Sequence, residues 1–170
     1  MVIFDVGGCS YKSTIAKKIA EKFGHKHISI DKLTYKDNWV RRTQEEFRTG
    51  LLNEIQLSDK YVIEGAFEDI KNPERETLMR DVVIPNSDIA IYFSVPKSVS
   101  LVRKLMRSCK RRLGLEYSDV AHESLKNIKE MIMKTINHYD ARKKHLDEVF
   151  DEMDQTKLMK IDFPNYPLVK

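Results

Sequence analysis

Cysteine is scarce in this 170-residue sequence, which contains only Cys9 and Cys109. Two cysteines are too few for a disulfide framework, and this predicts a reducing, intracellular setting. Long apolar runs are also missing, since no segment reaches the roughly 18 unbroken apolar residues of a membrane span. Met1 leads straight into a short apolar segment, without the basic start and cleavage site of a secretion signal. These absences predict a cytoplasmic protein without a membrane partner.

Repeats, low-complexity tracts and linkers rich in glycine, proline or serine are absent as well. We therefore expect residues 1–170 to form a single domain. Apolar residues make up 41% and charged residues 33% of the chain, which argues against disorder. The net charge of +4 is small; it suits phosphorylated small molecules as partners and leaves nucleic acid open. The five histidines and two cysteines show no metal-ligand spacing, so we predict no zinc site.

Apolar runs and helical periodicities alternate along the chain. Gly24 and Gly114 stand where helices would end, and Thr43 with Glu46 predicts a capping box. The alternation predicts an α/β fold with a five-stranded parallel sheet covered by helices on both faces, in which ligands bind beyond the carboxyl ends of the strands. The predicted strands are 2–6, 26–30, 61–65, 88–96 and 158–161, and the predicted helices are 13–23, 44–57, 98–113 and 120–150.

The segment MVIFDVGGCSYKSTIAKKIA reads as a strand, a glycine pair and a helix that opens with Lys-Ser-Thr. A phosphate-binding loop has glycine, four free residues, glycine, lysine and then serine or threonine. Val6 and Tyr11 occupy the two glycine positions, so the alternatives are a modified phosphate cradle and an ordinary strand–turn–helix with an exposed lysine. In a cradle, Lys12 would neutralise phosphate charge and the Ser13 hydroxyl would bind magnesium. The candidate nucleotide-binding residues are Gly7, Gly8, Cys9, Ser10, Tyr11, Lys12, Ser13 and Thr14.

Three further segments follow the loop in order: HISIDKLTYKDNWVRRTQEEFR, KYVIEGAF and IPNSDIAIYFSVPKSVSLVRKLMRSCKRR. Over roughly residues 2–160, the chain resembles the bacterial P-loop kinases called DNA topology modulation proteins, which are relatives of adenylate and shikimate kinases. That family has a strand ending in Asp, a Trp-Val segment with Arg, a Val-Ile-Asp-Gly strand, and Ala-Asp before an apolar strand. The corresponding residues here are Asp31, the run Trp39 to Arg42, the run Val62 to Gly65, and Ser87 with Asp88.

The resemblance implies a three-layer α/β/α P-loop kinase fold, with ATP and magnesium as cofactors. Glu64, where the family favours Asp, would hold magnesium through water, or would simply pair with a nearby lysine. Asp31, at the end of the second predicted strand, would orient or deprotonate an acceptor hydroxyl, or would serve as a turn or helix-capping residue. Trp39 and Arg42 fall in the acceptor region, although Trp39 could equally belong to the core. Ser94 replaces an acid that often ends the fourth strand.

Arg103, Arg107 and Arg111 recur every four residues and share one helix face. Related kinases carry arginines here that clamp phosphates, which implies charge stabilisation by Arg107 and Arg111. For Arg103 we expect a solvated basic face instead. Arg142 is a weaker second source of positive charge.

Three functions remain open at the level of sequence. The first is a magnesium-dependent phosphotransferase of the nucleoside-monophosphate-kinase type, which moves the γ-phosphate of ATP to a small acceptor such as a nucleotide or nucleoside. The second is a pseudo-kinase that binds a nucleotide without turnover. The third is a nucleic-acid-associated protein that uses the basic helix, although this helix lacks interleaved aromatic residues.

Overall fold

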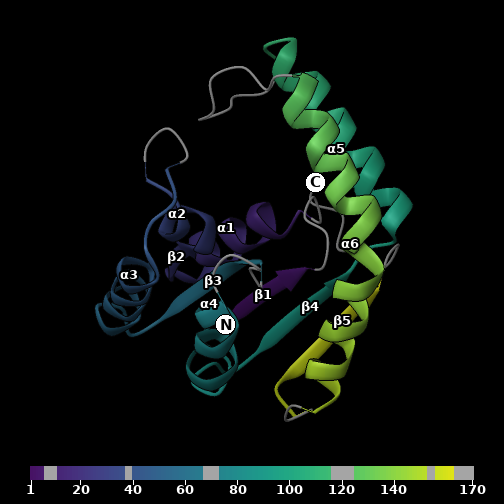
Figure 1. Cartoon of the computed structure of the whole chain (residues 1–170). Helices are drawn as coiled ribbons and strands as arrows, with labels where there is room; N and C mark the ends of the chain where they lie inside the picture. Colours follow the sequence, from purple (N-terminus) through teal and green to yellow (C-terminus); the bar gives the residue numbers. More distant parts are fainter. Residues whose placement is uncertain (6–10, 37–39, 67–72, 116–124, 153–155, 163–170) are drawn as a thin grey trace.

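A computed structural model describes residues 1–5, 11–36, 40–66, 73–115, 125–152 and 156–162. Five strands form one sheet in the order β2-β3-β1-β4-β5, and every neighbouring pair is parallel, as the alternation predicts. The central strand β1 is buried along its whole length (Figure 1). The strands are β1 (Val2–Asp5), β2 (Lys26–Ser29), β3 (Tyr61–Ala66), β4 (Ala90–Ser94) and β5 (Leu158–Asp162).

Helices cover both faces of the sheet, which confirms the predicted three layers. On one face, Ile15 and Ala16 of α1 pack with Ile3 of β1 and Val62 of β3. On the other face, side chains of α3, η2 and the carboxyl half of α6 pack against Phe4 and its neighbours. The helices are α1 (Lys12–Phe23), α2 (Ile30–Thr34), α3 (Gln44–Gln56), α4 (Pro73–Leu78), the π-helical turn η2 (Met79–Val83), α5 (Lys97–Arg112) and α6 (Leu125–Asp151).

Local signals in the sequence fix several helix ends. Gly24 ends α1 in a left-handed conformation with φ 65°, which glycine adopts without steric cost. The Thr43 hydroxyl accepts a hydrogen bond from the Glu46 amide while the Glu46 carboxylate accepts one from the Thr43 amide, so the predicted capping box is present. None of the helices in the described ranges is long and apolar enough to cross a membrane.

Three parts of the fold differ from the sequence prediction. The second strand ends at Ser29, and α2 begins at Ile30, so Asp31 lies in the first turn of a helix rather than at the end of a strand. Residues 73–83 form α4 and η2, where no element is predicted; both are too short to show a helical apolar period. The fourth strand is also shorter than predicted and covers only Ala90–Ser94.

The start of α2 depends on Gly65 of β3. A Cβ atom at Gly65 would lie 2.3 Å from Cβ and 2.7 Å from Cγ1 of Ile30, which is fully buried. Only a residue without a side chain allows β3 and α2 to approach this closely. This contact sets where the chain leaves β2 and where Asp31 lies.

Gly65→Ala should therefore lower the free energy of unfolding by about 1–3 kcal/mol, because the added methyl group must displace Ile30 or the backbone. Gly50→Ala is the matched control, since its new Cβ would meet Leu33 Cδ2 at an ordinary 3.5 Å. This control should gain about 0.5–1 kcal/mol, as expected for alanine inside a helix. Urea unfolding of both variants tests the prediction, and equal stabilities would contradict it.

Candidate functional site

The carboxyl end of β1 and the start of α1 bring Lys12 next to Asp5. The Lys12 Nζ atom lies 3.4 Å from the Asp5 carboxylate, and the two side chains are only 11% and 2% exposed. The expectation of an exposed lysine, which belongs to the strand–turn–helix alternative, is therefore wrong, while the loop itself, residues 6–10, lies outside the described part of the chain. The lysine is the first residue of α1 and is largely buried beneath the end of the sheet.

Three carboxylates act on this one ammonium group. Burial by itself lowers the pKa of Lys12, but Asp5, Glu64 and Asp31, together with the hydrogen bond to Asp5, raise it above the usual value for lysine. Lys12 is therefore positively charged at neutral pH. Three acids around one base leave an excess of negative charge, which favours a further cation at this end of the sheet.

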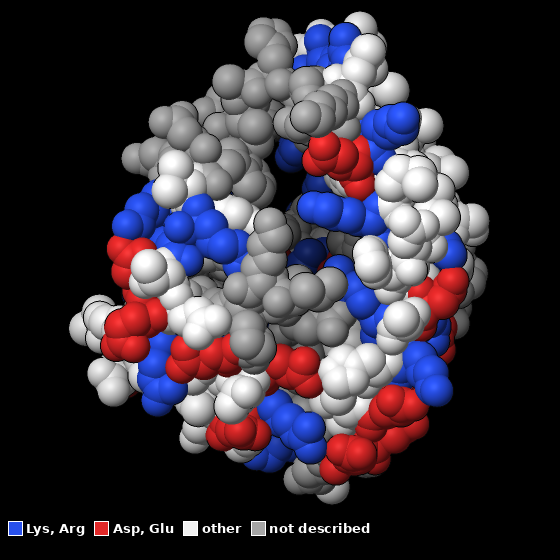
Figure 2. Space-filling view, in the orientation of Figure 1, with Lys and Arg blue, Asp and Glu red and all other residues white. Residues whose placement is uncertain are grey.

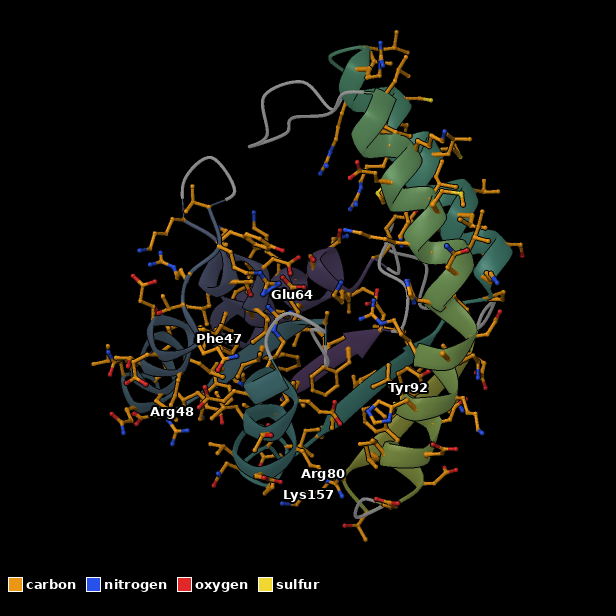
Figure 3. The ribbon with its side chains drawn as sticks, in the orientation of Figure 1. Phe47, Arg48, Glu64, Arg80, Tyr92 and Lys157 are labelled. Carbon is orange, nitrogen blue, oxygen red and sulfur yellow. The ribbon has the colours of Figure 1, made fainter. Side chains whose placement is uncertain are left out.

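Glu64 and Ser13 form the second contact of the site. The Ser13 hydroxyl donates a 2.8 Å hydrogen bond to Oε2 of Glu64, which is 2% exposed. Figure 3 shows Glu64 between β3 and α1. A serine hydroxyl and a carboxylate are the hard oxygen ligands that Mg²⁺ prefers, so these two residues fit the ion that the family resemblance implies. Within the described ranges there is no cluster of three or more His, Cys, Asp or Glu side chains suited to a metal.

His27 is a neighbour of Glu64 that the sequence analysis misses. Its Nε2 atom is buried, has no hydrogen-bond partner among the described residues, and lies 3.8 Å from Oε1 of Glu64. In the sheet register, His27 is paired with Val62 and Ser29 with Glu64. Strand alternation along β2 and β3 therefore places His27 on the α1 side of the sheet, a signal that could have identified it.

Tyr11 has a left-handed backbone conformation, which glycine adopts most readily. Its φ of 63° and ψ of 11° are left-handed, and it is the one described residue other than glycine with positive φ. The phenol ring is 57% exposed, and the Arg103 guanidinium carbon lies 4.7 Å from the ring centroid. The expectation that Arg103 belongs to a merely solvated face is therefore wrong, because this arginine joins α5 to the start of α1.

The other predicted arginines lie on α5 and α6. Arg107 and Arg111 follow Arg103 by one and two turns of α5, and both are half-buried. Arg142 lies on α6, which packs beside α5. Figure 2 shows a hollow between the α5–α6 pair and the opposite side of the molecule, with lysine and arginine side chains on its walls.

A second group of polar residues lies around α2. The buried Arg75 donates a hydrogen bond to the Thr34 hydroxyl and stacks over Phe47, with 5.3 Å between its guanidinium carbon and the ring centroid. Arg42 is half-buried, and its amide donates a 2.8 Å hydrogen bond to the Thr34 carbonyl. Arg75 could not be predicted from the sequence, because α4 is too short to show an apolar period that would place it inside.

Several predicted site residues lie outside the described part of the chain, namely Val6, Gly7, Gly8, Cys9, Ser10 and Trp39. Of the described loop residues, Thr14 is exposed in the first turn of α1. The structure thus brings together Tyr11, Lys12, Ser13, Asp31 and Glu64 of the predicted set, and it adds Asp5, His27 and Arg103.

Comparison with known proteins adds little to this site. No family model matches the chain, and none of the curated proteins matches it at a significant level. Among solved structures, an uncharacterized protein from Eubacterium ventriosum ATCC 27560 has 18% identical residues and a TM-score of 0.47. That match covers 95% of this chain and 86% of that chain. A likeness this distant carries no argument about function.

Lys12→Met should lower the free energy of unfolding by about 2–4 kcal/mol, because it leaves the buried Asp5 carboxylate without its ammonium partner. Adding Asp5→Asn to this variant should restore part of the loss. Lys17→Met, on the same helix, is the control: its pair with Glu21 is exposed, at 4.0 Å, and should contribute less than about 1 kcal/mol. Urea unfolding at neutral pH measures all three, and equal effects of the two single changes would contradict the buried pair.

Proposed function

We propose that this chain is a magnesium-dependent phosphotransferase that binds ATP at the start of α1 and moves the γ-phosphate to a small acceptor, such as a nucleotide or nucleoside. The proposal rests on the observation that Lys12, Ser13 and Glu64 lie together near the carboxyl ends of β1 and β3. An ammonium, a hydroxyl and a carboxylate at a helix amino terminus suit a nucleotide polyphosphate and its metal ion. The resemblance to P-loop kinases, whose segments occur here in the same order along the chain, supports the same function.

Each residue has a role that follows from its charge and place. An ammonium group has three N–H donors, so Lys12 can donate to a phosphate oxygen while it stays 3.4 Å from its partner Asp5. Lys12 would then neutralise phosphate charge, while Ser13 and Glu64 would hold magnesium directly or through water. ATP supplies the transferable phosphoryl group. Catalysis by the chain would come mainly from positioning and charge.

Asp31 and the arginines would complete the reaction site. Asp31 is exposed in the first turn of α2, and its charge raises the pKa of Lys12, so we assign it the role of orienting or deprotonating an acceptor hydroxyl. Arg107 and Arg111, on the face of α5 that carries Arg103, would stabilise charge on the phosphoryl group. Arg42 would bind the acceptor near Thr34. In a pseudo-kinase, the same residues would bind the nucleotide, but no phosphoryl group would be transferred.

The nucleic-acid alternative finds less support. Arg103, Arg107 and Arg111 are half-buried rather than displayed on an open surface, and Arg103 contacts the start of α1. A nucleic-acid backbone needs accessible basic side chains along a continuous path.

Binding of ATP with magnesium should raise the melting temperature of the chain more than either ligand alone, because bound ligand stabilises the folded state. Glu64→Gln should abolish most of the magnesium-dependent part of this shift and leave the shift by ATP alone largely intact. Glu54→Gln, which changes a partly exposed carboxylate paired with Lys26 on the surface, is the control and should behave as wild type. Absence of any shift would contradict both the kinase and the pseudo-kinase, whereas binding without phosphate transfer would leave the pseudo-kinase.

Replacing Tyr11 should separate the effect of its ring from that of its backbone. Tyr11→Ala removes the ring and keeps the strain of positive φ, which costs roughly 1–2 kcal/mol for a residue with a side chain. Tyr11→Gly removes both, so it should be about 1 kcal/mol more stable than Tyr11→Ala and should bind ATP up to about tenfold more tightly than wild type. Calorimetric titration and urea unfolding measure the two effects; weaker ATP binding by Tyr11→Gly would mean that the ring itself contacts the nucleotide.

A further inference from the structure

Helix α5 turns apolar side chains outward. Its exposed residues include Val102, Leu105 and Met106, each exposed by 47% or more, and the free thiol of Cys109; Leu113, just after the helix, is exposed as well. Lys110 and Arg112 are the exposed basic residues of its last turn. The half-buried residues of the same helix are largely basic, among them Arg103, Lys104 and the arginines that follow one and two turns later. This distribution is the reverse of that on an ordinary surface helix, where the charged side faces water.

Helix α6 continues this apolar surface. The two helices run antiparallel, because the Lys104 side chain donates to the Thr135 hydroxyl at 2.6 Å while Lys97 pairs with Asp140 at 2.7 Å. One residue further along each chain, Leu105 and Ile136 turn about 100° away from this contact. In an antiparallel pair, that rotation brings both side chains to the same side of the hairpin.

The same geometry places other exposed apolar residues beside them and the basic residues opposite. Arg103, one residue before Lys104, turns to the other side of the hairpin, where it contacts Tyr11. Figure 1 shows α5 and α6 lying side by side and reaching beyond the end of the sheet, so no other element of the described residues backs the outer part of the hairpin. We define the apolar hairpin face as Val102, Leu105, Cys109, Leu125, Met133 and Ile136, which Met106 and Leu113 extend along α5.

We infer that the apolar hairpin face is the interface of a homodimer, in which two α5–α6 hairpins pack as a four-helix bundle. Seven large apolar side chains, exposed by 41% to 72%, approach the roughly 800 Å² per partner of a standard interface. Monomers rarely expose a contiguous apolar patch larger than a few hundred Å². A two-helix hairpin has one unpaired side, and a second hairpin related by a two-fold axis completes the four-helix layer.

An anionic membrane fits this face less well than a second copy of the chain. Helices that lie on membranes carry lysine and arginine along both borders of their apolar side, where these residues reach the lipid headgroups. Here Arg103, Arg107 and Lys104 lie toward α6 or the body of the molecule, and Arg112 and Lys129 are the exposed basic residues near the face.

Sedimentation across a concentration series tests the inference on the full chain. The wild type should dimerise, with association maintained or strengthened at high salt, because apolar burial drives it. Leu105→Glu and Ile136→Glu should each weaken dimerisation at least tenfold. Leu57→Glu, which changes a side chain that is 78% exposed at the end of α3, should dimerise as wild type.

Circular dichroism and melting curves of the same variants show whether they fold. The two changes lie on different helices, so the test of the interface needs only one glutamate variant that folds. A monomeric wild type at all concentrations would overturn the inference. So would a dimer that both folded glutamate variants retain, since it would use another surface. Association of the wild type with anionic vesicles as a monomer, lost in Leu105→Glu, would overturn it in favour of a membrane surface.

Discussion

The ammonium group of Lys12, buried close to three carboxylates, is the interaction on which the candidate site depends. Asp5 is 2% exposed, and the first residue of α1 places the Lys12 ammonium group 3.4 Å from its carboxylate. The ion pair therefore holds the end of β1 against the start of α1. It also keeps a positive charge at the helix amino terminus, where phosphate groups commonly bind.

The sheet decides which acids reach this lysine. Side chains alternate between the two faces of a strand, so Asp5 and Glu64 point to the α1 side together with Ile3 and Val62. Asp31 arrives by a different route, because Gly65 lets Ile30 approach β3 so closely that α2 begins there. One missing Cβ atom thus helps to place an acid that lies far from Asp5 in the sequence.

Polarity divides the α5–α6 hairpin into two surfaces. One side carries Arg103, which contacts Tyr11 at the start of α1, and the opposite side is largely apolar. A basic surface toward a phosphate site and an apolar surface toward a second copy would use both sides of the same helix pair. In that arrangement, dimerisation would fix the hairpin that supplies charge to the site, because the bundle would hold both helices along their length.

The sequence by itself determined the parallel α/β sheet, the capping box at Thr43, the end of α1 at Gly24 and the adjacent positions of Lys12 and Ser13 at the start of α1. Each of these depends on near neighbours in the chain, such as an apolar period, a cap or a glycine. Only the tertiary structure decided that Lys12 is buried, that His27 adjoins Glu64, that Arg75 lies inside and that Arg103 stacks on Tyr11. These contacts join residues that lie from 7 to 92 positions apart in the sequence. Strand register, the close approach at Gly65 and the packing of α5 bring these residues together in space. No local sequence pattern encodes such contacts.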